Sequence, residues 1–126
     1  MSWYREILAF LPSVLTVPVK RSVVDQKKVD RLANTLTLYE SSTCPFSAKV
    51  RRHLKYLNVS ITCKNLKRCH TYQKELLAGG GRALVPCLRI DSAQGSRWLY
   101  ESQDILGYLN QKFEPKAKSK PLEQVL

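Results

Sequence analysis

The spacing of apolar residues divides the middle of the chain into short strands and amphipathic helices. The segment TLTLYE alternates with a period of two, which predicts a strand over 35–40. A helix is then predicted from Pro45 to Asn58, because proline is favoured at the first helical position and apolar residues follow at intervals of three or four. Those apolar residues, on one predicted face, are Phe46, Val50, Leu54 and Leu57.

The same patterns continue along the chain and predict the remaining elements. These are a strand over 59–63, a helix over 72–78 closed by the glycines 79–81, strands over 86–91 and 97–100, and a helix over 102–113 that Ser102 caps. The order β-α-β-α-β-β-α implies parallel pairing across the helical crossovers and an antiparallel hairpin at the end. The sequence therefore predicts an α/β fold with a mixed four-stranded sheet flanked by helices, in which the strand over 86–91 lies beside the first strand.

Composition divides the chain into three zones and limits the classes of partner. Residues 1–34 form an apolar, then basic leader that could be helical, 35–113 form the patterned domain, and 114–126 form a tail rich in proline and lysine that we expect to be disordered. The 126 residues carry 21 Lys and Arg against 10 Asp and Glu, a net charge of +11, which favours anionic partners. The aromatic residues do not interleave with the basic ones and no nucleic-acid-binding motif is present, so a nucleic-acid partner is not expected.

The first candidate for chemistry is Cys44, in the segment CPFS where the first strand turns into the first helix. The free amides and the positive end of a helix dipole favour a thiolate over a thiol at this position. Such a cysteine is nucleophilic near neutral pH. The alternative is a buried structural cysteine, which is the commoner role of a free thiol.

Two further motifs stand near the predicted ends of strands and helices. Val85-Pro86 begins a strand, and a cis peptide bond there would leave the backbone of Val85 ready to pair with an extended peptide, whereas a trans proline would only start an edge strand. Glu101-Ser102 begins the last helix, where free amides bind carboxylates, although Ser102 could equally be a plain cap.

Taken together, these three motifs resemble those of glutaredoxins and of the amino-terminal domains of glutathione S-transferases, which share the thioredoxin-like fold. The resemblance covers about 36–113 and is greatest in CPFSAKVRRHL and LVPCLRI…WLYESQDILGYL, which are similar to small single-domain bacterial glutaredoxin-like proteins. It implies a thioredoxin-like (glutaredoxin) fold with an N-terminal extension, and glutathione as the cofactor.

The resemblance also implies a role for each motif. Cys44 would form a mixed disulfide with glutathione, and Pro45 and Phe46 beside it would help to bind the tripeptide. Val85, ahead of a cis Pro86, would pair with the cysteinyl part of the tripeptide. The residues expected to hold its γ-glutamyl end are Glu101 and Ser102. Those expected to reach the glycyl carboxylate, without a decisive signal among them, are Gln73, Lys74 and Arg82.

Two departures from the family pattern suggest the reaction. Ser47 stands where close relatives carry a second, resolving cysteine, and Ser41 stands where many glutaredoxins carry a lysine. Without a resolving thiol the dithiol route is closed. The sequence therefore predicts a monothiol glutathione-dependent oxidoreductase that acts on glutathionylated or disulfide-containing proteins through Cys44.

Three alternatives remain open. One is a binding module in which Cys44 and glutathione ligate an iron–sulfur cluster across a dimer, although monothiol glutaredoxins of that kind generally have glycine in place of Pro45. Another is a conjugating transferase that draws its electrophile pocket from a partner. The third is a glutathione-binding, membrane-associated protein with little activity.

The other cysteines and the leader are less informative. Cys63 and Cys69 lack zinc-site spacing and Cys87 fits a core position, so no metal site is predicted. Four irregularly spaced cysteines suit a reducing compartment, which predicts a cytoplasmic protein. The leader over 1–31 could lie on the anionic inner face of a membrane, fold back over the domain, or form a dimer contact.

Overall fold

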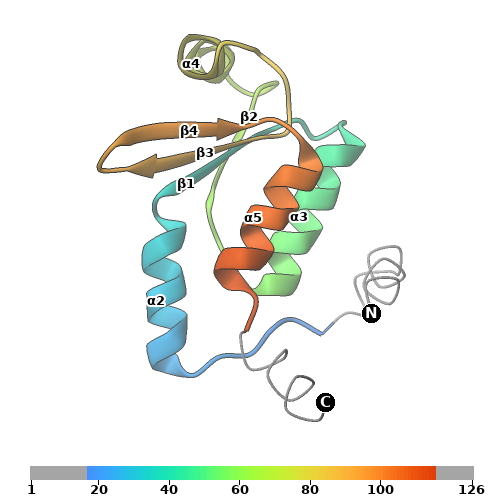
Figure 1. The fold of residues 1–126 in the computed structure, drawn as a ribbon. Helices are drawn as coiled ribbons and strands as arrows, with labels where there is room; N and C mark the ends of the chain where they lie inside the picture. The colour runs from blue at the N-terminus through green and yellow to red at the C-terminus, as the bar shows by residue number, and fades with distance from the viewer. Residues whose placement is uncertain (1–16, 116–126) are drawn as a thin grey trace.

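A computed structural model of the chain describes residues 17–115, and their helices and strands follow the predicted order behind one additional helix (Figure 1). The elements are α2 Val23–Ala33, β1 Leu36–Glu40, α3 Pro45–Leu57, β2 Thr62–Asn65, α4 His70–Gly80, β3 Cys87–Ser92, β4 Gly95–Leu99 and α5 Ser102–Phe113. The predicted tail over 114–126 lies outside the described residues from 116 onward. The predicted domain over 35–113 corresponds to β1 through α5.

The four strands form one mixed sheet in the order β2-β1-β3-β4. β1 pairs in parallel with β2, β1 pairs antiparallel with β3, and β3 and β4 form an antiparallel hairpin. Gly95, with φ of 118°, closes the turn of that hairpin, a conformation that glycine adopts without steric cost. This is the predicted thioredoxin-like architecture, with the strand after Pro86 beside the first strand. The parallel pairing predicted across the helical crossovers holds only for β1 and β2, and it is wrong for the crossover through α4, because β3 runs antiparallel to β1.

One face of the sheet is covered by α2, α3 and α5 and carries the larger apolar core (Figure 1). Side chains alternate across a strand, so Leu36 and Leu38 of β1 and Leu88 and Ile90 of β3 point to this face. The helical residues that meet them are Val50, Leu54 and Leu57 of α3, Ile105, Leu109 and Phe113 of α5, and Ala33 of α2. The predicted apolar faces of both long helices are therefore confirmed, apart from Phe46.

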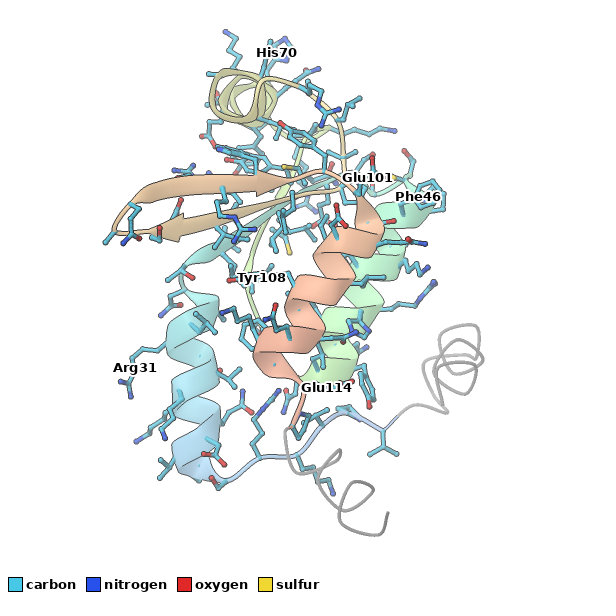
Figure 2. The ribbon with its side chains drawn as sticks, in the orientation of Figure 1. Arg31, Phe46, His70, Glu101, Tyr108 and Glu114 are labelled. Atoms are coloured by element: carbon cyan, nitrogen blue, oxygen red, sulfur yellow. The ribbon has the colours of Figure 1, made fainter. Side chains whose placement is uncertain are left out.

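Phe46 was expected on the core face of α3, and that prediction is wrong. Its side chain is 58% exposed, whereas Ser47 is fully buried in its place. The buried face of α3 runs from Leu57 and Leu54 through Val50 to Ser47, three positions before Val50, so Phe46 lies beside that face and not on it. The exposed ring stands at the edge of the molecule (Figure 2).

The opposite face of the sheet carries α4 over a smaller cluster of Tyr39, Leu76 and Cys87. The glycines 79–81 were expected to end this helix, but only Gly81 does so, as a left-handed cap with φ of 90°. Gly79 and Gly80 belong to the helix, where a Cβ atom would lie 2.2 Å from the ring of Trp98 and 1.9 Å from the hydroxyl of Tyr100 respectively. These two glycines permit close contact between α4 and β4.

The second strand is shifted from its predicted position over 59–63 to Thr62–Asn65. The amide of Val59 donates to the carbonyl of Leu54, and Asn58 adopts a left-handed conformation, so this segment completes the end of α3. Pairing with β1 then starts at Thr62, opposite Thr37. An edge strand needs only backbone pairing, so its polar sequence carried little signal.

The described part of the leader folds back against the domain. Val19 is buried and its amide donates to the carbonyl of Tyr56, while Arg21 donates to the carbonyl of Phe113 at 2.6 Å. Ser22 caps α2 by accepting from the amide of Asp25. Within 17–115, no helix combines the length and the apolar character needed to cross a membrane.

Candidate functional site

The site is built around Cys44, which the fold places where β1 turns into α3. The backbone of Cys44 is extended, with φ of −88° and ψ of 120°, and Pro45 occupies the first helical position, which makes Cys44 the N-cap residue. Its side chain is partly exposed. The sulfur is therefore open to a reactant at the helix start.

The surroundings of Cys44 favour its ionised form. Burial acts to raise the pKa of the thiol, but hydrogen bonding by the backbone and hydroxyl of Ser47 and by the backbone of Phe46 lowers it, together with the charge of Arg51. The balance puts the pKa of Cys44 below its ordinary value. Helix-start amides stabilise a thiolate in the way the sequence indicates.

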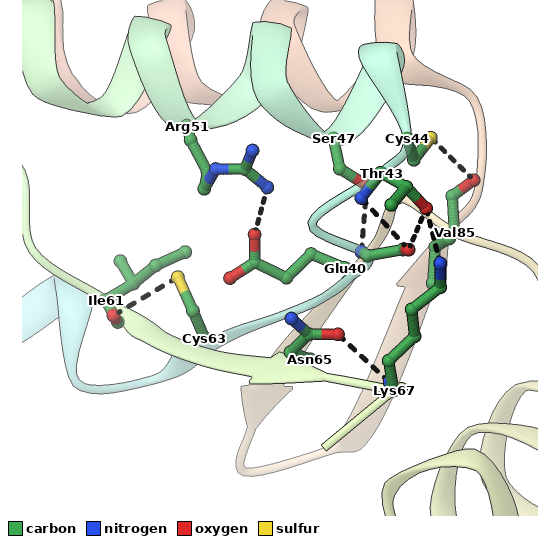
Figure 3. A network of polar contacts seen from close by, with 11 residues as sticks. Glu40, Thr43, Cys44, Ser47, Arg51, Ile61, Cys63, Asn65, Lys67 and Val85 are labelled. Atoms are coloured by element: carbon green, nitrogen blue, oxygen red, sulfur yellow. Dashed lines mark hydrogen bonds and ion pairs between the residues drawn. The ribbon is translucent and has the colours of Figure 1, made fainter. Parts of the chain in front are cut away.

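Ser47 also holds the turn that carries Cys44. Its fully buried hydroxyl accepts a hydrogen bond from the amide of Ser41 at 3.3 Å, and the amide of Cys44 donates to the carbonyl of Ser41 at 3.1 Å. Arg51, one turn further along α3, forms an ion pair with the buried Glu40 at the end of β1 (Figure 3). These contacts fix the first turns of α3 against β1.

Val85 approaches Cys44 from the loop that precedes β3. The Sγ atom of Cys44 lies 4.0 Å from the carbonyl oxygen of Val85, within reach of a weak S–H···O hydrogen bond (Figure 3). The peptide bond between Val85 and Pro86 is cis, the isomer that the family resemblance implies. Two motifs separated by 41 residues thus meet in space.

Glu101 and Ser102 lie at the same end of the molecule as Cys44. The helices α3 and α5 run side by side in the same direction, and a hydrogen bond between His53 and Asn110 joins them eight positions after the first residue of each helix (Figure 1). Their amino ends are consequently level, and Figure 2 shows Glu101 beside Phe46 at that end. The expected cap is corrected: Glu101 is the N-cap residue, and Ser102 is the first residue of α5.

Lys67 is a candidate that the sequence pattern did not reveal. Its Nζ donates to the Oγ1 of Thr43 at 2.7 Å, which brings an ammonium group next to the residue before Cys44 (Figure 3). The Oγ atom of Ser41 lies 3.2 Å from that same hydroxyl. The signal that could have located Lys67 is topological, because parallel β1 and β2 end at the same edge of the sheet and Lys67 follows β2.

The residues expected to reach a carboxylate from α4 and its loop lie differently. Gln73 and Lys74 are exposed on α4, which covers the other face of the sheet. The guanidinium of Arg82 lies 4.4 Å from the centroid of the Tyr100 ring, and the Tyr100 hydroxyl donates to the carbonyl of Arg82. Of the cations considered, Lys67 has the direct hydrogen bond to the turn of Cys44.

The remaining cysteines differ in ionisation. Burial raises the pKa of Cys87 to about 11. Cys63 is an exposed residue, but partial desolvation of its sulfur together with the Glu40 carboxylate raises its pKa to about 11. Cys69 is instead the N-cap residue of α4, and hydrogen bonds from the side chain and backbone of Thr71 lower its pKa. The sequence analysis missed this second helix-start thiol because α4 begins two residues earlier than predicted.

Within the part of the chain that the structure describes, no three His, Cys, Asp or Glu side chains gather in a way that could hold a metal ion. The groups that the structure brings together around Cys44 are an ionisable thiol at a helix start, a backbone carbonyl beside it, and a second helix start and an ammonium group nearby.

Comparison with known proteins identifies relatives of this arrangement. Residues 38–117 match the family described as the glutathione S-transferase N-terminal domain. A comparison with curated protein sequences returns no significant match.

Three solved structures illustrate the similarity. A diazinon-metabolizing glutathione S-transferase from the silkworm Bombyx mori is 28% identical, with a TM-score of 0.51 over 64% of this chain and 38% of that one. Glutathione transferase E6 from Drosophila melanogaster is 26% identical, with a TM-score of 0.52 over 71% of this chain and 41% of that one. Glutathione transferase Omega 3C from Trametes versicolor, at 17% identity and a TM-score of 0.54 over 77% and 44%, shows the shared fold. The aligned region spans less than half the length of each transferase.

Proposed function

Because the chain belongs to the family of glutathione S-transferase N-terminal domains and has their thioredoxin-like fold, we propose that it is a monothiol glutathione-dependent oxidoreductase acting through Cys44. The observation that carries the proposal is the position of Cys44 at the start of α3. Its pKa is lowered there and its sulfur is 4.0 Å from the carbonyl of Val85.

The proposed reaction removes glutathione from a protein or small thiol in two exchanges. The Cys44 thiolate attacks the glutathione sulfur of a mixed disulfide, the S–S bond breaks, and the released thiolate of the substrate takes a proton from water. Cys44 is then joined to glutathione. A second glutathione, as thiolate, attacks the glutathionyl sulfur, leaves as glutathione disulfide, and restores the Cys44 thiolate.

The second exchange depends on an external thiol because Ser47 occupies the position of a resolving cysteine. Ser47 is fully buried and hydrogen-bonded to the amide of Ser41, and its hydroxyl has no redox chemistry. Cys63 and Cys87, with raised pKa values, are poor nucleophiles near neutral pH. We therefore assign the second thiol to glutathione, and the Cys69→Ser variant tests whether Cys69, whose pKa is lowered at the start of α4, takes part instead.

Glutathione would lie across the amino ends of α3 and α5. The backbone of Val85, next to Pro86, would pair with the cysteinyl residue beside Cys44, and the 4.0 Å between the Val85 carbonyl oxygen and Sγ supports this assignment. The two residues proposed for the γ-glutamyl group, Glu101 and Ser102, begin α5 with free helix-start amides. Lys67, hydrogen-bonded to Thr43, is the cation proposed for the glycyl carboxylate. Pro45 and the backbone of Phe46 complete the thiol's surroundings.

A second candidate function is transfer of glutathione to an electrophile, and the transferases among the relatives favour it. Those proteins are more than twice as long as the matched region, so conjugation would need a pocket from a further domain or partner. An electrophilic aromatic substrate tested beside the disulfide substrate separates the two functions.

The deciding experiment measures glutathione-dependent release of a peptide from its mixed disulfide with glutathione. The wild type is expected to turn over only with glutathione present, and Cys44→Ser is expected to fall to the uncatalysed rate. Cys69→Ser is the matched control, because it removes the other thiol at a helix N-cap. Equal loss in both variants, or activity that persists in Cys44→Ser, contradicts the proposal.

A further inference from the structure

One side of α2 packs on the domain, and the other side faces solvent. Ala33 is buried in the core, and Val29 and Leu32 pack against it. Five exposed residues lie on the opposite side, within about 140° of one another around the axis of this α-helix, which turns by about 100° per residue. We call them the outer face of α2, and they are Val23, Val24, Lys27, Lys28 and Arg31. Figure 2 shows Arg31 projecting away from the domain.

Two adjacent valines make part of the outer face apolar. Val23 is 72% exposed and Val24 is 63% exposed, and they are the first two residues of α2, directly after its cap Ser22. Because the cap fixes the first turn, both side chains are held in water. Exposed apolar residues are ordinary when they occur singly, so these two indicate a binding surface only together with the charges beside them.

Three cations complete the outer face. Within 17–115, the side chains of Lys27, Lys28 and Arg31 have no hydrogen-bond or ion-pair partner. The two acidic residues of α2, Asp25 and Asp30, lie at the two edges of the outer face. Asp30 accepts a hydrogen bond at 3.0 Å from another side chain of α2. The face between these edges therefore carries three positive charges and no negative one.

A hollow of about 490 Å³ opens beside the outer face, where the leader meets α2. Val23 and Lys27 line it, so the hollow and the outer face form one continuous surface. Lys20, which has no partner among residues 17–115, and Arg21 bring further positive charge to the hollow, against the single carboxylate of Asp30. Lysine and arginine side chains bind phosphate groups, so a phosphate is the kind of anion that this hollow favours.

We propose that the outer face of α2, with the hollow beside it, docks on a membrane surface that contains anionic phospholipid. The valines enter the boundary between headgroups and acyl chains, and the cations lie among the lipid phosphates. Interfaces between proteins are enriched in aromatic residues and depleted in lysine, whereas the outer face has two lysines and no aromatic residue. A nucleic acid would leave both valines in water. The composition of the face therefore favours lipid.

Docking through α2 leaves Cys44 open. The helix ends before β1 begins at Leu36, whereas Cys44 follows the other end of β1, at Glu40. Figure 1 shows α2 far from the amino ends of α3 and α5. The inference therefore goes beyond the proposed function and does not depend on the reaction of Cys44.

The test measures sedimentation of the full chain with vesicles of phosphatidylcholine, with and without phosphatidylglycerol. We expect binding to the anionic vesicles only, and weaker binding as added salt screens the charges. The double variant Lys27→Gln, Lys28→Gln should bind about 25-fold more weakly, since each cation near an anionic membrane contributes about fivefold. The matched control is Arg52→Gln, Lys55→Gln, which removes the same charge from exposed positions on α3 and should keep the wild-type affinity.

A second double variant, Val23→Ser, Val24→Ser, tests the apolar contribution. It should weaken binding about tenfold while binding stays salt-dependent, because apolar surface no longer leaves water. Urea denaturation verifies that each variant is folded.

A wild-type protein that does not bind the anionic vesicles overturns the inference, and so does an equal loss of affinity in the two charge variants. Unchanged affinity in either α2 variant also overturns it, because the binding would then lie elsewhere, residues 1–16 included. Binding to an acidic polypeptide or to DNA, without binding to vesicles, has the same consequence. Glutathione-dependent turnover is measured separately, so none of these outcomes contradicts the proposed function.

Discussion

At the scale of single residues, reactivity is decided by which thiol has hydrogen-bond donors around it. Cys44 has helix-start donors and the charge of Arg51, whereas Cys63 and Cys87 have pKa values raised to about 11. A free cysteine ionises near pH 8.5. The fold thus gives chemically identical thiols different pKa values, because their surroundings differ.

We predict that Cys44 reacts with iodoacetamide faster than Cys63 and Cys87 at neutral pH, because only the thiolate is alkylated. Cys69, whose pKa is also lowered, should follow Cys44 more closely than the other two do. Mass-mapped labelling of the native protein over a range of pH measures this order. The rate at Cys44 should rise with pH and level off below the pH at which a free thiol does.

The denatured protein provides the control, since all four thiols should then label at similar rates. Equal labelling of the four cysteines in the native protein, with a common titration near the value of a free thiol, would remove the chemical basis for Cys44 as the nucleophile.

Ser47 is the residue predicted to limit the protein to the monothiol route. Ser47→Cys should form a disulfide with Cys44, since thiols at the two ends of a Cys-x-x-Cys segment at a helix start are within bonding distance. The reduced variant should lose about 1 kcal/mol of stability because a thiol is a weaker acceptor for the Ser41 amide. Thiol counting after mild oxidation should find two fewer thiols than in the reduced variant.

The same variant should gain glutathione-independent reduction of a protein disulfide, while the wild type continues to need glutathione. Wild-type reduction of dithiol substrates without glutathione would mean that Cys63, Cys69 or Cys87 acts as a resolving thiol. That result would refute the monothiol mechanism.

At the scale of elements, α4 packs closely against β4 because Gly79 and Gly80 have no side chains at the contact. Gly79→Ala and Gly80→Ala should each lower the free energy of unfolding by about 1–3 kcal/mol, the usual cost of overpacking, because the new Cβ meets Trp98 or Tyr100. Gly107→Ala is the control, in the helix α5 with no atom within 4 Å of a new Cβ, and it should raise stability by about 0.5–1 kcal/mol. Urea denaturation measures all three changes, and a stabilising Gly79→Ala would contradict this packing.

The same region shows what local patterns could and could not predict. Periodicity located β1, α3 and α5, because burial on one face leaves a regular apolar spacing. Periodicity did not show the contact of Gly79 with Trp98. A glycine that ends a helix and a glycine that allows a neighbouring ring to pack closely look the same in the local sequence. The shift of β2 has a similar origin, because an edge strand carries no required apolar alternation.

The features of the site that depend on residues adjacent in the sequence could be predicted, whereas those that depend on contacts between distant residues could not. Cys44 at a strand-to-helix turn is a local feature, and the placement of Val85 beside it follows from the order of strands. The contact of Lys67 with Thr43 joins residues 24 positions apart through a loop, and no local pattern marks it. The exposure of Phe46 beside a buried Ser47 depends on which side of the first turn faces the sheet, and a spacing of three or four residues fits either position.

At the scale of the whole molecule, Arg21 joins the leader to three elements. Its guanidinium donates to the side chain of Gln26 in α2, to the carbonyl of Asn58 after α3, and to the carbonyl of Phe113 at the end of α5. These hydrogen bonds link the C-terminal ends of α3 and α5, where the last carbonyl groups have no hydrogen-bond donor within their own helix. The segment before α2 is thus part of the folded unit.

We predict that Arg21→Ala lowers the free energy of unfolding by about 1–3 kcal/mol, because hydrogen bonds from a charged donor are lost together. Arg52→Ala, at an exposed position on α3, should change stability by less than about 0.5 kcal/mol. Urea denaturation compares the two, and hydrogen exchange should show faster exchange over 17–33 in the first variant only. Equal stability of the two variants would show that the leader is not held by Arg21.

The most direct test of Cys44 as the glutathione-linked thiol is peptide mass mapping after incubation of the native protein with glutathione disulfide. Our account predicts one added glutathione, at Cys44, which added glutathione removes again, and no comparable adduct in Cys44→Ser. Adducts spread evenly over the four cysteines, or an unmodified Cys44, would contradict it.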